Sequence, residues 1–351
     1  MFLRESRATL DLAVDRQCGF RKMESQMEKK NHLGALGALG LSLVSVVAGC
    51  GGGTSEVTVI AAGSYHTCAV VGGGVRCWGA NFSGQLGNNS TTQSAVPVQV
   101  EGLTAGVTAL DADWQDSCAV VNGEAQCWGA YYGNLSYVPA HVEGLTMGVT
   151  AVAAGESHTC VLVNGGVQCW GNNQMGQLGN NSINPGSKVP VQVDGLTTGV
   201  TAIAAGRSHT CAVVNGGVQC WGGNSDGQLG NTSIAQDMYS GSKVPVQVEG
   251  LTSGVTAIAA SLWNTCAVVD GGVQCWGANY YGQLGNNSTT KSAVPVQAEG
   301  LTTGATAIAV GATHSCAVVD NAVQCWGENP DGELGNDSTT DSTVPVQVLL
   351  Q

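Results

Sequence analysis

The order of hydrophobic and polar residues repeats six times along this chain, at a spacing of about fifty residues. One copy reads VTAIAAGRSHTCAVVNGGVQCWGGNSDGQLG over residues 200–230 and, after a spacer, VPVQV over residues 244–248. Short runs of small and β-branched residues, separated by glycine and asparagine, are typical of strands joined by turns. Each copy therefore predicts four strands, and a repeat of this length indicates a propeller or a solenoid.

All six copies contain all four predicted strands. The first strands begin at Val57, Val107, Val149, Val200, Val255 and Ala305, and the fourth strands cover 96–100, 138–142, 189–193, 244–248, 294–298 and 344–348. Few residues join a fourth strand to the next first strand, whereas a long stretch separates the third strand from the fourth. Because short connections usually join neighbouring strands, we expect each blade to combine one fourth strand with the next copy's first three. The strand at 344–348 would then pair with the strand at Val57, so that both chain ends close an all-β, six-bladed propeller without exposed edges.

Two cysteines in every copy flank a predicted tight turn. Eight residues separate Cys211 from Cys220, and Asn215-Gly216, which tolerates the positive φ of a type I′ turn, lies at their centre. Counting outward from the turn places the cysteines opposite each other at a non-hydrogen-bonded position, where Cα atoms lie about 4.5 Å apart. Zinc binding is the alternative, but this spacing does not match a zinc knuckle. We predict six disulfides: Cys68–Cys77, Cys118–Cys127, Cys160–Cys169, Cys211–Cys220, Cys266–Cys275 and Cys316–Cys325.

The first fifty residues differ in kind from the repeats. From Met27, a short basic segment precedes the apolar stretch LGALGALGLSLVSVV and then Ala48-Gly49-Cys50. This order is typical of a secretory signal, and the last residues resemble the lipobox of bacterial lipoproteins, which implies cleavage before Cys50 and lipidation of that cysteine. An ordinary signal peptide with an incidental cysteine is the alternative. We expect residues 1–26 to be untranslated or disordered, 27–49 to be the signal peptide, 50–56 the lipid anchor and tether, and 57–351 the propeller.

The repeat pattern AAGxxHTCAVVxGGVQCWGxNxxGQLG followed by VPVxV resembles the regulator of chromosome condensation repeat family. The resemblance covers residues 57–348 and implies a β-propeller with four-stranded blades, although the best known members have seven copies. It is specific for fold and not for function. The second copy departs from the pattern with Asp113 where most copies have glycine, Asp116 at the histidine position, and Gly-Asn-Leu-Ser over 133–136 instead of Gly-Gln-Leu-Gly. The fifth copy has Asn264 at the histidine position.

The charge of the chain argues against nucleic acid as a partner. Residues 50–351 contain five basic and twenty acidic residues, which gives a net charge of 5 − 20, or −15. Such a surface repels phosphate backbones. The glycine-rich stretches lack the lysine and helix of a phosphate-binding loop, and no Gly-x-Ser-x-Gly stretch leads from a strand into a helix as a nucleophile elbow requires. We therefore expect no enzymatic activity, no cofactor and no bound metal.

The recurring polar and aromatic positions have structural interpretations. Histidine recurs two positions before the first cysteine in four copies, at His66, His158, His209 and His314, and we interpret it as a hydrogen bonder that stabilises the turn. The tryptophan of each Cys-Trp-Gly is predicted to pack between blades, at Trp78, Trp128, Trp170, Trp221, Trp276 and Trp326. The Asn- and Asp-rich loops at 88–90 and 329–341 offer oxygen atoms to calcium but lack a defined ligand spacing, which favours polar solvated loops.

Variable loop positions place aromatic residues at one end of the predicted ring. The turn before the second strand and the loop after the third strand should share a face, which would carry Tyr65, Phe82, Trp114, Tyr131, Tyr132, Met175, Trp263, Tyr280 and Tyr281. Aromatic residues on the loops of a rigid scaffold are typical of interaction surfaces, although they can also fill irregular turns.

These observations favour a monomeric, non-enzymatic lipoprotein of the bacterial cell envelope, at the outer membrane or the cell surface. The lipid anchor would be its contact with the membrane, and the aromatic face would bind an envelope or extracellular protein. One alternative is an inhibitor of an enzyme such as a β-lactamase, because the resemblance includes secreted propellers that bind β-lactamases. Glycan binding is another. Nucleotide exchange on a small GTPase, which the family's nuclear namesake implies, does not suit an exported acidic domain.

Overall fold

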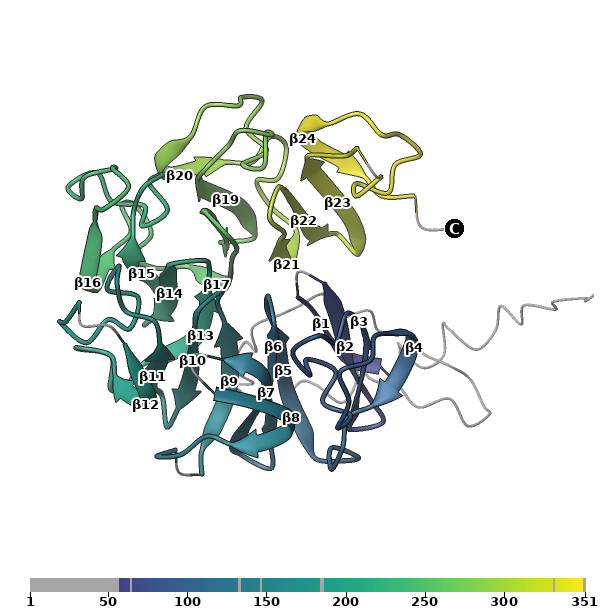
Figure 1. The fold of residues 1–351 in the computed structure, drawn as a ribbon. Helices are drawn as coiled ribbons and strands as arrows, with labels where there is room; N and C mark the ends of the chain where they lie inside the picture. Colours follow the sequence, from purple (N-terminus) through teal and green to yellow (C-terminus); the bar gives the residue numbers. More distant parts are fainter. Residues whose placement is uncertain are drawn as a thin grey trace, which may run out of the picture.

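The computed structural model describes residues 57–63, 65–131, 134–145, 147–183, 186–330 and 332–349. These residues form six four-stranded antiparallel sheets around a common axis (Figure 1), as predicted, and each first strand begins at the predicted residue. The first three blades contain β1 Val57–Ala62, β2 His66–Val71, β3 Gly74–Gly79, β4 Ser94–Gln99, β5 Val107–Ala112, β6 Asp116–Val121, β7 Glu124–Tyr131, β8 Asn134–His141, β9 Val149–Ala154, β10 His158–Val163, β11 Gly166–Gly171 and β12 Ser187–Gln192. The last three contain β13 Val200–Ala205, β14 His209–Val214, β15 Gly217–Gly223, β16 Gly241–Gln247, β17 Val255–Ala260, β18 Asn264–Val269, β19 Gly272–Gly277, β20 Ser292–Gln297, β21 Ala305–Val310, β22 His314–Val319, β23 Ala322–Gly327 and β24 Ser342–Gln347.

The predicted exchange of strands between copies is wrong. Each sheet contains four consecutive strands of one copy, with the first strand nearest the axis and the fourth outermost. Strand β24 pairs with β23, with Cys325 opposite Val346, and not with β1. The two chain ends therefore do not share a blade, and every blade has an outer edge.

Loop length misled this prediction for two physical reasons. The seven residues 100–106 can extend over about 23 Å, more than the roughly 14 Å across a four-stranded sheet, so the short link reaches from the outer strand to the next inner strand. Hydrogen bonds hold this link beneath its own blade, from the Val75 amide to the Leu103 carbonyl and from the Val107 amide to the Gly73 carbonyl. The long loop after the third strand contacts the next blade and then returns to its own blade, where the fourth strand pairs with the third.

Proline protects the exposed outer edges. Each fourth strand contains a proline, which lacks an N–H donor and so weakens pairing with another chain. The six are Pro97, Pro139, Pro190, Pro245, Pro295 and Pro345.

The six predicted disulfides are present between the second and third strands of every blade. Their Cα atoms lie 4.0 to 4.1 Å apart. The intervening turns have the expected positive φ, as at Asn215 (51°) and Gly216 (82°). No cluster of histidine, cysteine or acidic residues that could hold a metal occurs among the described residues.

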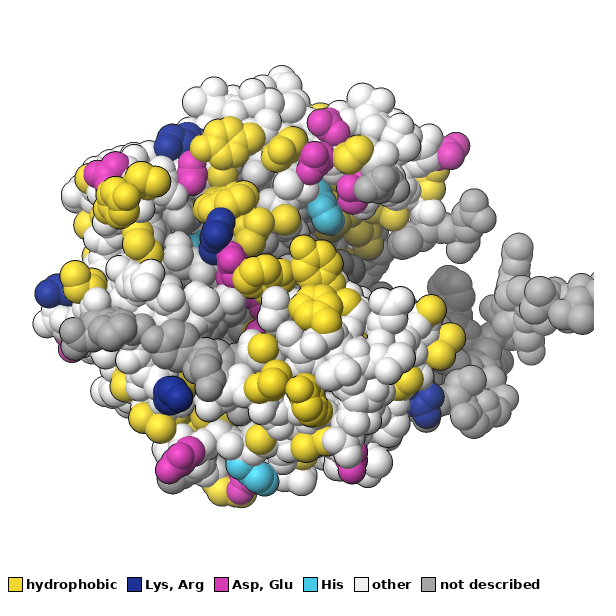
Figure 2. Space-filling view, viewed as in Figure 1, with side chains coloured by type: hydrophobic (Ala, Val, Ile, Leu, Met, Phe, Trp, Pro, Cys, Tyr) yellow, Lys and Arg dark blue, Asp and Glu magenta, His cyan; other side chains and the backbone are white. Residues whose placement is uncertain are grey.

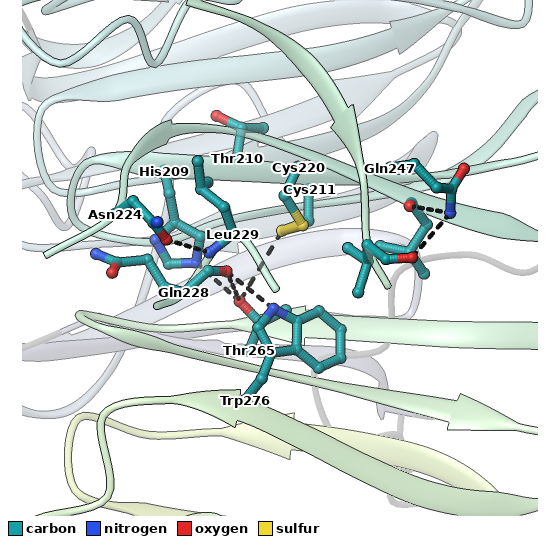
Figure 3. Close-up of a disulfide and its surroundings, with 12 residues drawn as sticks. His209, Thr210, Cys211, Cys220, Asn224, Gln228, Leu229, Gln247, Thr265 and Trp276 are labelled. Carbon is teal, nitrogen blue, oxygen red and sulfur yellow. Dashed lines mark hydrogen bonds between the residues drawn. A yellow bond between two sulfur atoms is a disulfide. The ribbon is translucent and has the colours of Figure 1, made fainter. Parts of the chain in front are cut away.

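Neighbouring blades are joined by a recurring hydrogen-bonded unit, shown for the fourth and fifth blades in Figure 3. The indole Nε1 of Trp276 donates to the Gln228 carbonyl at 2.9 Å, and the Thr265 hydroxyl donates to the same carbonyl at 3.4 Å. His209 Nε2 lies 2.9 Å from that hydroxyl. Because the hydroxyl proton is directed to the carbonyl, His209 donates through Nε2. The long loop thus carries the Gly-Gln-Leu-Gly motif to the next blade, which confirms interblade packing of this tryptophan.

Apolar clusters fill five blade junctions. Each combines disulfide cysteines and valines of one blade with aliphatic residues and the fully buried Cys-Trp-Gly tryptophan of the next blade, which is Trp128, Trp170, Trp221, Trp276 or Trp326. No such cluster lies between the sixth and first blades within the described residues. Accordingly, Trp78 of the first blade is only half-buried, whereas its five counterparts are fully buried.

Candidate protein-binding face

Two loops of every blade meet at the same end of the ring. The second residue after each Cys-Trp-Gly tryptophan donates its amide to a carbonyl in the turn before the second strand, as from Ala80 to Tyr65, Ala130 to Gln115 and Ala278 to Trp263. The predicted common face is therefore formed, and the Asn-Gly turns lie at the opposite end. We call the end that carries these paired loops the loop face.

Large aromatic side chains are exposed on the loop face (Figure 2). Tyr65, Phe82 and Tyr280 are each more than half exposed, and Trp114 and Tyr281 are about 40% exposed. Met175 and Trp263 are half-buried. The side chains of Tyr131 and Tyr132 lie outside the described part of the structure, as does Cys50. No helix able to cross a membrane occurs among the described residues.

Specific contacts hold several of these aromatic rings in place. Tyr65 and Phe82 meet edge to face with their centroids 6.3 Å apart. The Tyr280 hydroxyl donates to Asp226 at 2.6 Å across the junction of the fourth and fifth blades. Rings that are already fixed lose little conformational entropy on binding, which favours their use as contact points.

The predicted role of the recurring histidine in its own turn is wrong at three positions. His66, His158 and His209 reach Ser117, Thr210 and Thr265 of the following blade at 2.7 to 2.9 Å. Burial lowers the pKa of His66 and His158 to about 4 and that of His209 to about 3. These histidines are therefore neutral interblade hydrogen bonders.

Steric contact explains why the second and fifth copies lack this histidine. In the other copies a glycine precedes it by three residues, and a Cβ at Gly63, Gly155 or Gly311 would lie 2.6 to 2.8 Å from the histidine ring. The second copy has Asp113 at this glycine position and the fifth has Ser261. Both copies also have a side chain smaller than histidine at the histidine position. Loss of the glycine and loss of the histidine therefore occur together.

The second copy gathers three carboxylates beside the ring axis. Asp111 replaces the alanine of the other first strands and accepts hydrogen bonds from the amides of Ala112 at 3.0 Å and Ala154 at 2.8 Å. Asp113 lies on the turn that follows, and Asp116 is the first residue of β6. No lysine or arginine forms an ion pair with these three within the described part of the chain. Sequence reasoning noted Asp113 and Asp116 but missed Asp111, although alanine at this position in the other five copies was a usable signal.

Burial and mutual repulsion perturb these carboxyl groups. Burial raises the pKa of Asp111 to about 6. Burial first, and then Asp116, Asp111 and Glu156, raise the pKa of Asp113 to about 8. Burial and Asp111 raise the pKa of Asp116 to about 7. The cluster is therefore partly protonated near neutral pH, because no cation of the chain compensates it.

The carboxylates adjoin a cavity on the ring axis. Its volume is about 510 Å³, and aliphatic residues of the six first strands form most of its wall. Its charged lining residues are Asp111, Asp113 and Arg207. Arg207 is already engaged, because its Nε lies 2.7 Å from Glu156 and its guanidinium carbon lies 5.7 Å from the Trp263 ring centroid. The cavity therefore combines apolar walls with an uncompensated negative charge.

The second copy also alters its junction with the third blade. Gly-Asn-Leu-Ser replaces Gly-Gln-Leu-Gly, and the loop is replaced by a direct hairpin of β7 and β8. The Nε1 of Trp170 is consequently buried without a hydrogen-bond partner. A cavity of about 20 Å³ lies beside it, lined in part by Asp116 and His158.

Two further repeat positions stabilise the loops and escaped sequence reasoning. Asn81 Nδ2 donates to the carbonyls of Ser90 and Thr92, and its Oδ1 accepts from the Leu86 amide. Gln99 Nε2 donates to three carbonyls beneath the blade. In the last copy, the side-chain Nδ2 of Asn329 makes the equivalent loop contacts. Loop oxygens at 88–90 and 329–341 thus serve internal hydrogen bonds.

Comparison with known families agrees with this architecture. A model of the regulator of chromosome condensation (RCC1) repeat matches residues 72–113, 164–213, 215–268 and 270–318, and a second RCC1 repeat model matches 57–85, 149–177 and 200–228. The chain belongs to the RCC1 repeat family. The matches of the first model alone cover more than half of the sequence.

Relatives of this RCC1 repeat protein share the fold. The E3 ubiquitin-protein ligase HERC2 of Homo sapiens is 39% identical over 108 residues, which are 30% of this chain and 2% of HERC2. The structure of Prp20p from Saccharomyces cerevisiae, studied for binding to Gsp1p and histones, is 24% identical with a TM-score of 0.74, covering 84% of this chain and 77% of Prp20p. Human WBSCR16 is 22% identical with a TM-score of 0.73, covering 90% and 91%.

Proposed function

We propose that this protein binds another protein through its loop face and has no enzymatic activity of its own. Support comes mainly from the exposed aromatic side chains, which the RCC1 repeat scaffold presents on paired, hydrogen-bonded loops. Tyrosine and tryptophan are the residues that most often dominate protein interfaces. The described carboxylates and histidines supply buried structural groups and not an arrangement of nucleophile, base and oxyanion donors.

We further propose that the protein acts at the bacterial cell envelope. The apolar stretch before Ala48-Gly49-Cys50 supports export and lipidation, and export suits the six disulfides, which persist in oxidising compartments. The lipid on Cys50 would hold the propeller, as a monomer, near the membrane. Metabolic labelling with a palmitate analogue tests this directly: the full chain should incorporate label, Cys50→Ala should not, and label in that variant would contradict the proposal.

Capture from cell-envelope and culture proteins tests the binding face. The full chain is compared with Trp114→Ala/Tyr280→Ala/Tyr281→Ala, and with Met147→Ala as a control from the opposite end of the ring. We expect a protein that the wild type and the control retain and the triple variant loses, with all three showing the same far-UV circular dichroism. Equal retention by all three would reject the loop face as the binding site.

The same experiment separates the alternatives. Inhibition of a purified β-lactamase panel would identify the partner as an enzyme of that class. Retention of a glycan in an array, lost in the triple variant, would identify a carbohydrate ligand in place of a protein.

A further inference from the structure

The axial cavity of about 510 Å³ opens among the loops that carry the aromatic residues. Two of its lining residues, Asp113 and Leu262, are followed directly in the chain by Trp114 and Trp263. Figure 2 shows hydrophobic side chains around the centre of this face, with an acidic and a basic side chain next to each other among them. A group that enters the cavity would therefore contact aromatic residues at the mouth and aliphatic residues inside.

The charge inside the cavity is unbalanced. Asp111 and Asp113 line it, and Asp116, which is 5% exposed and lines the small cavity beside Trp170, interacts electrostatically with both from behind the wall. Arg207, the basic residue that lines the cavity, is paired with Glu156 at 2.7 Å. A buried carboxylate is stabilised most by an opposite charge brought to it, and water is a poor substitute inside an apolar wall.

We infer that the axial cavity receives a lysine or arginine side chain from a protruding segment of the protein partner. An aliphatic stem matches the alanine, valine and isoleucine walls, and a cationic end matches Asp111 and Asp113. A protein supplies this group better than a free amine, because a polypeptide also contacts the exposed aromatic rim. This inference rests on the proposed protein-binding function of the same face.

Entry of a cation has a proton-coupled signature. Asp111, Asp113 and Asp116 are partly protonated near neutral pH, with pKa values raised to about 6, 8 and 7. Glu156, Arg207 and His158 are the other titratable groups that face them. A bound cation favours the ionised carboxylates, so binding releases protons and strengthens as the pH rises from 6 to 8.

Fluorescence anisotropy with short peptides tests the inference. The probes are fluorescein-labelled Gly-Ser-Lys-Ser-Gly peptide and the same peptide with norleucine, which keeps the stem and removes the charge. The proteins are wild type, Asp111→Asn/Asp113→Asn, and the control Glu143→Gln/Glu299→Gln, which removes two exposed charges elsewhere. Asparagine at 111 retains an acceptor for one of the two backbone amides, which donate to different carboxylate oxygens of Asp111.

We expect the lysine peptide to bind wild type and control equally, and roughly tenfold or more weakly to the double aspartate variant, as expected for loss of one charge interaction. The norleucine peptide should bind wild type more weakly than the lysine peptide does, by a similar factor. Equal binding of both peptides, equal binding by the aspartate variant, or no binding would overturn the inference. Cadaverine competing as well as the lysine peptide would reject a protein side chain as the occupant. Partner capture that depends on Trp114 but not on the aspartates would leave the proposed function standing and remove this inference alone.

Discussion

The blade junctions provide two tryptophans at one repeat position that differ in a hydrogen bond and in the cavity of about 20 Å³ beside Trp170. Trp221 and Trp170 occupy the same repeat position and are 0% and 1% exposed. Trp221 Nε1 donates to the Gln177 carbonyl at 2.9 Å, whereas Trp170 Nε1 has no partner. Substitution of either by phenylalanine removes a similar volume, so the packing cost is shared.

The hydrogen bond should separate the two variants. Trp221→Phe loses a buried bond of about 1 kcal/mol, and its carbonyl still accepts from the Thr210 hydroxyl at 3.0 Å. Trp170→Phe removes a buried donor that costs about 1 to 3 kcal/mol while unpaired. We therefore expect Trp221→Phe to be about 2 to 4 kcal/mol less stable than Trp170→Phe. Urea denaturation of the oxidised full chain, followed by far-UV circular dichroism, measures this difference. An equal decrease in the free energy of unfolding in the two variants, or a larger decrease in Trp170→Phe, would refute the hydrogen-bond account of the junctions.

Three further outcomes follow from the described contacts. Gly206→Ala should cost about 2 kcal/mol or more, because the added Cβ clashes with the Ser261 carbonyl oxygen of the next blade and with the His209 ring. His209→Asn should relieve only the second clash and restore part of the stability, as measured by urea midpoints of the single and double variants. Replacing Cys211 and Cys220 by alanine should cost about 2 to 3 kcal/mol, and electrospray mass spectrometry of the unreduced wild type should find no alkylated thiol among the repeat cysteines; twelve would exclude the disulfides. Asp116 has a folded pKa of about 7, above its unfolded value, so its contribution is complete below pH 4 and is lost as the pH rises through 7. The buried histidines, whose pKa values are lowered, act in the opposite direction, so the test is the difference between two proteins: the urea midpoint of Asp116→Asn relative to that of wild type should rise between pH 4 and pH 8.

Local patterns were enough to predict the strands, turns and disulfides. The Asn215-Gly216 turn determines which residues face each other, and the alternation of side chains along the strands then places Cys211 opposite Cys220. The assignment of strands to blades failed because it depends on contacts distant in sequence. Loop length does not reveal that Gln228 carries its carbonyl to Trp276 of the next blade before the chain returns.

The candidate face was predicted in outline and its chemistry was not. Loop positions alone placed Trp114 and Tyr280 at one end of the ring, which the structure confirms. Asp111 was missed because one polar residue in an inner strand resembles ordinary strand variation until the ring brings it to the axis beside Asp113. The exclusion of histidine by a neighbouring side chain is likewise a packing effect, visible only once Gly206 and His209 are in contact.

Hydroxyl-radical footprinting of the protein, free and bound to its captured partner, tests the central claim most directly. Exposed tyrosine, tryptophan and methionine all react, so both ends of the ring are reported in one experiment. We predict that binding protects Tyr65, Trp114 and Tyr280 and leaves Met147, which is 62% exposed beside the Asn122-Gly123 turn, unchanged. Protection of Met147 with unchanged oxidation of the three aromatic residues would contradict binding through the loop face.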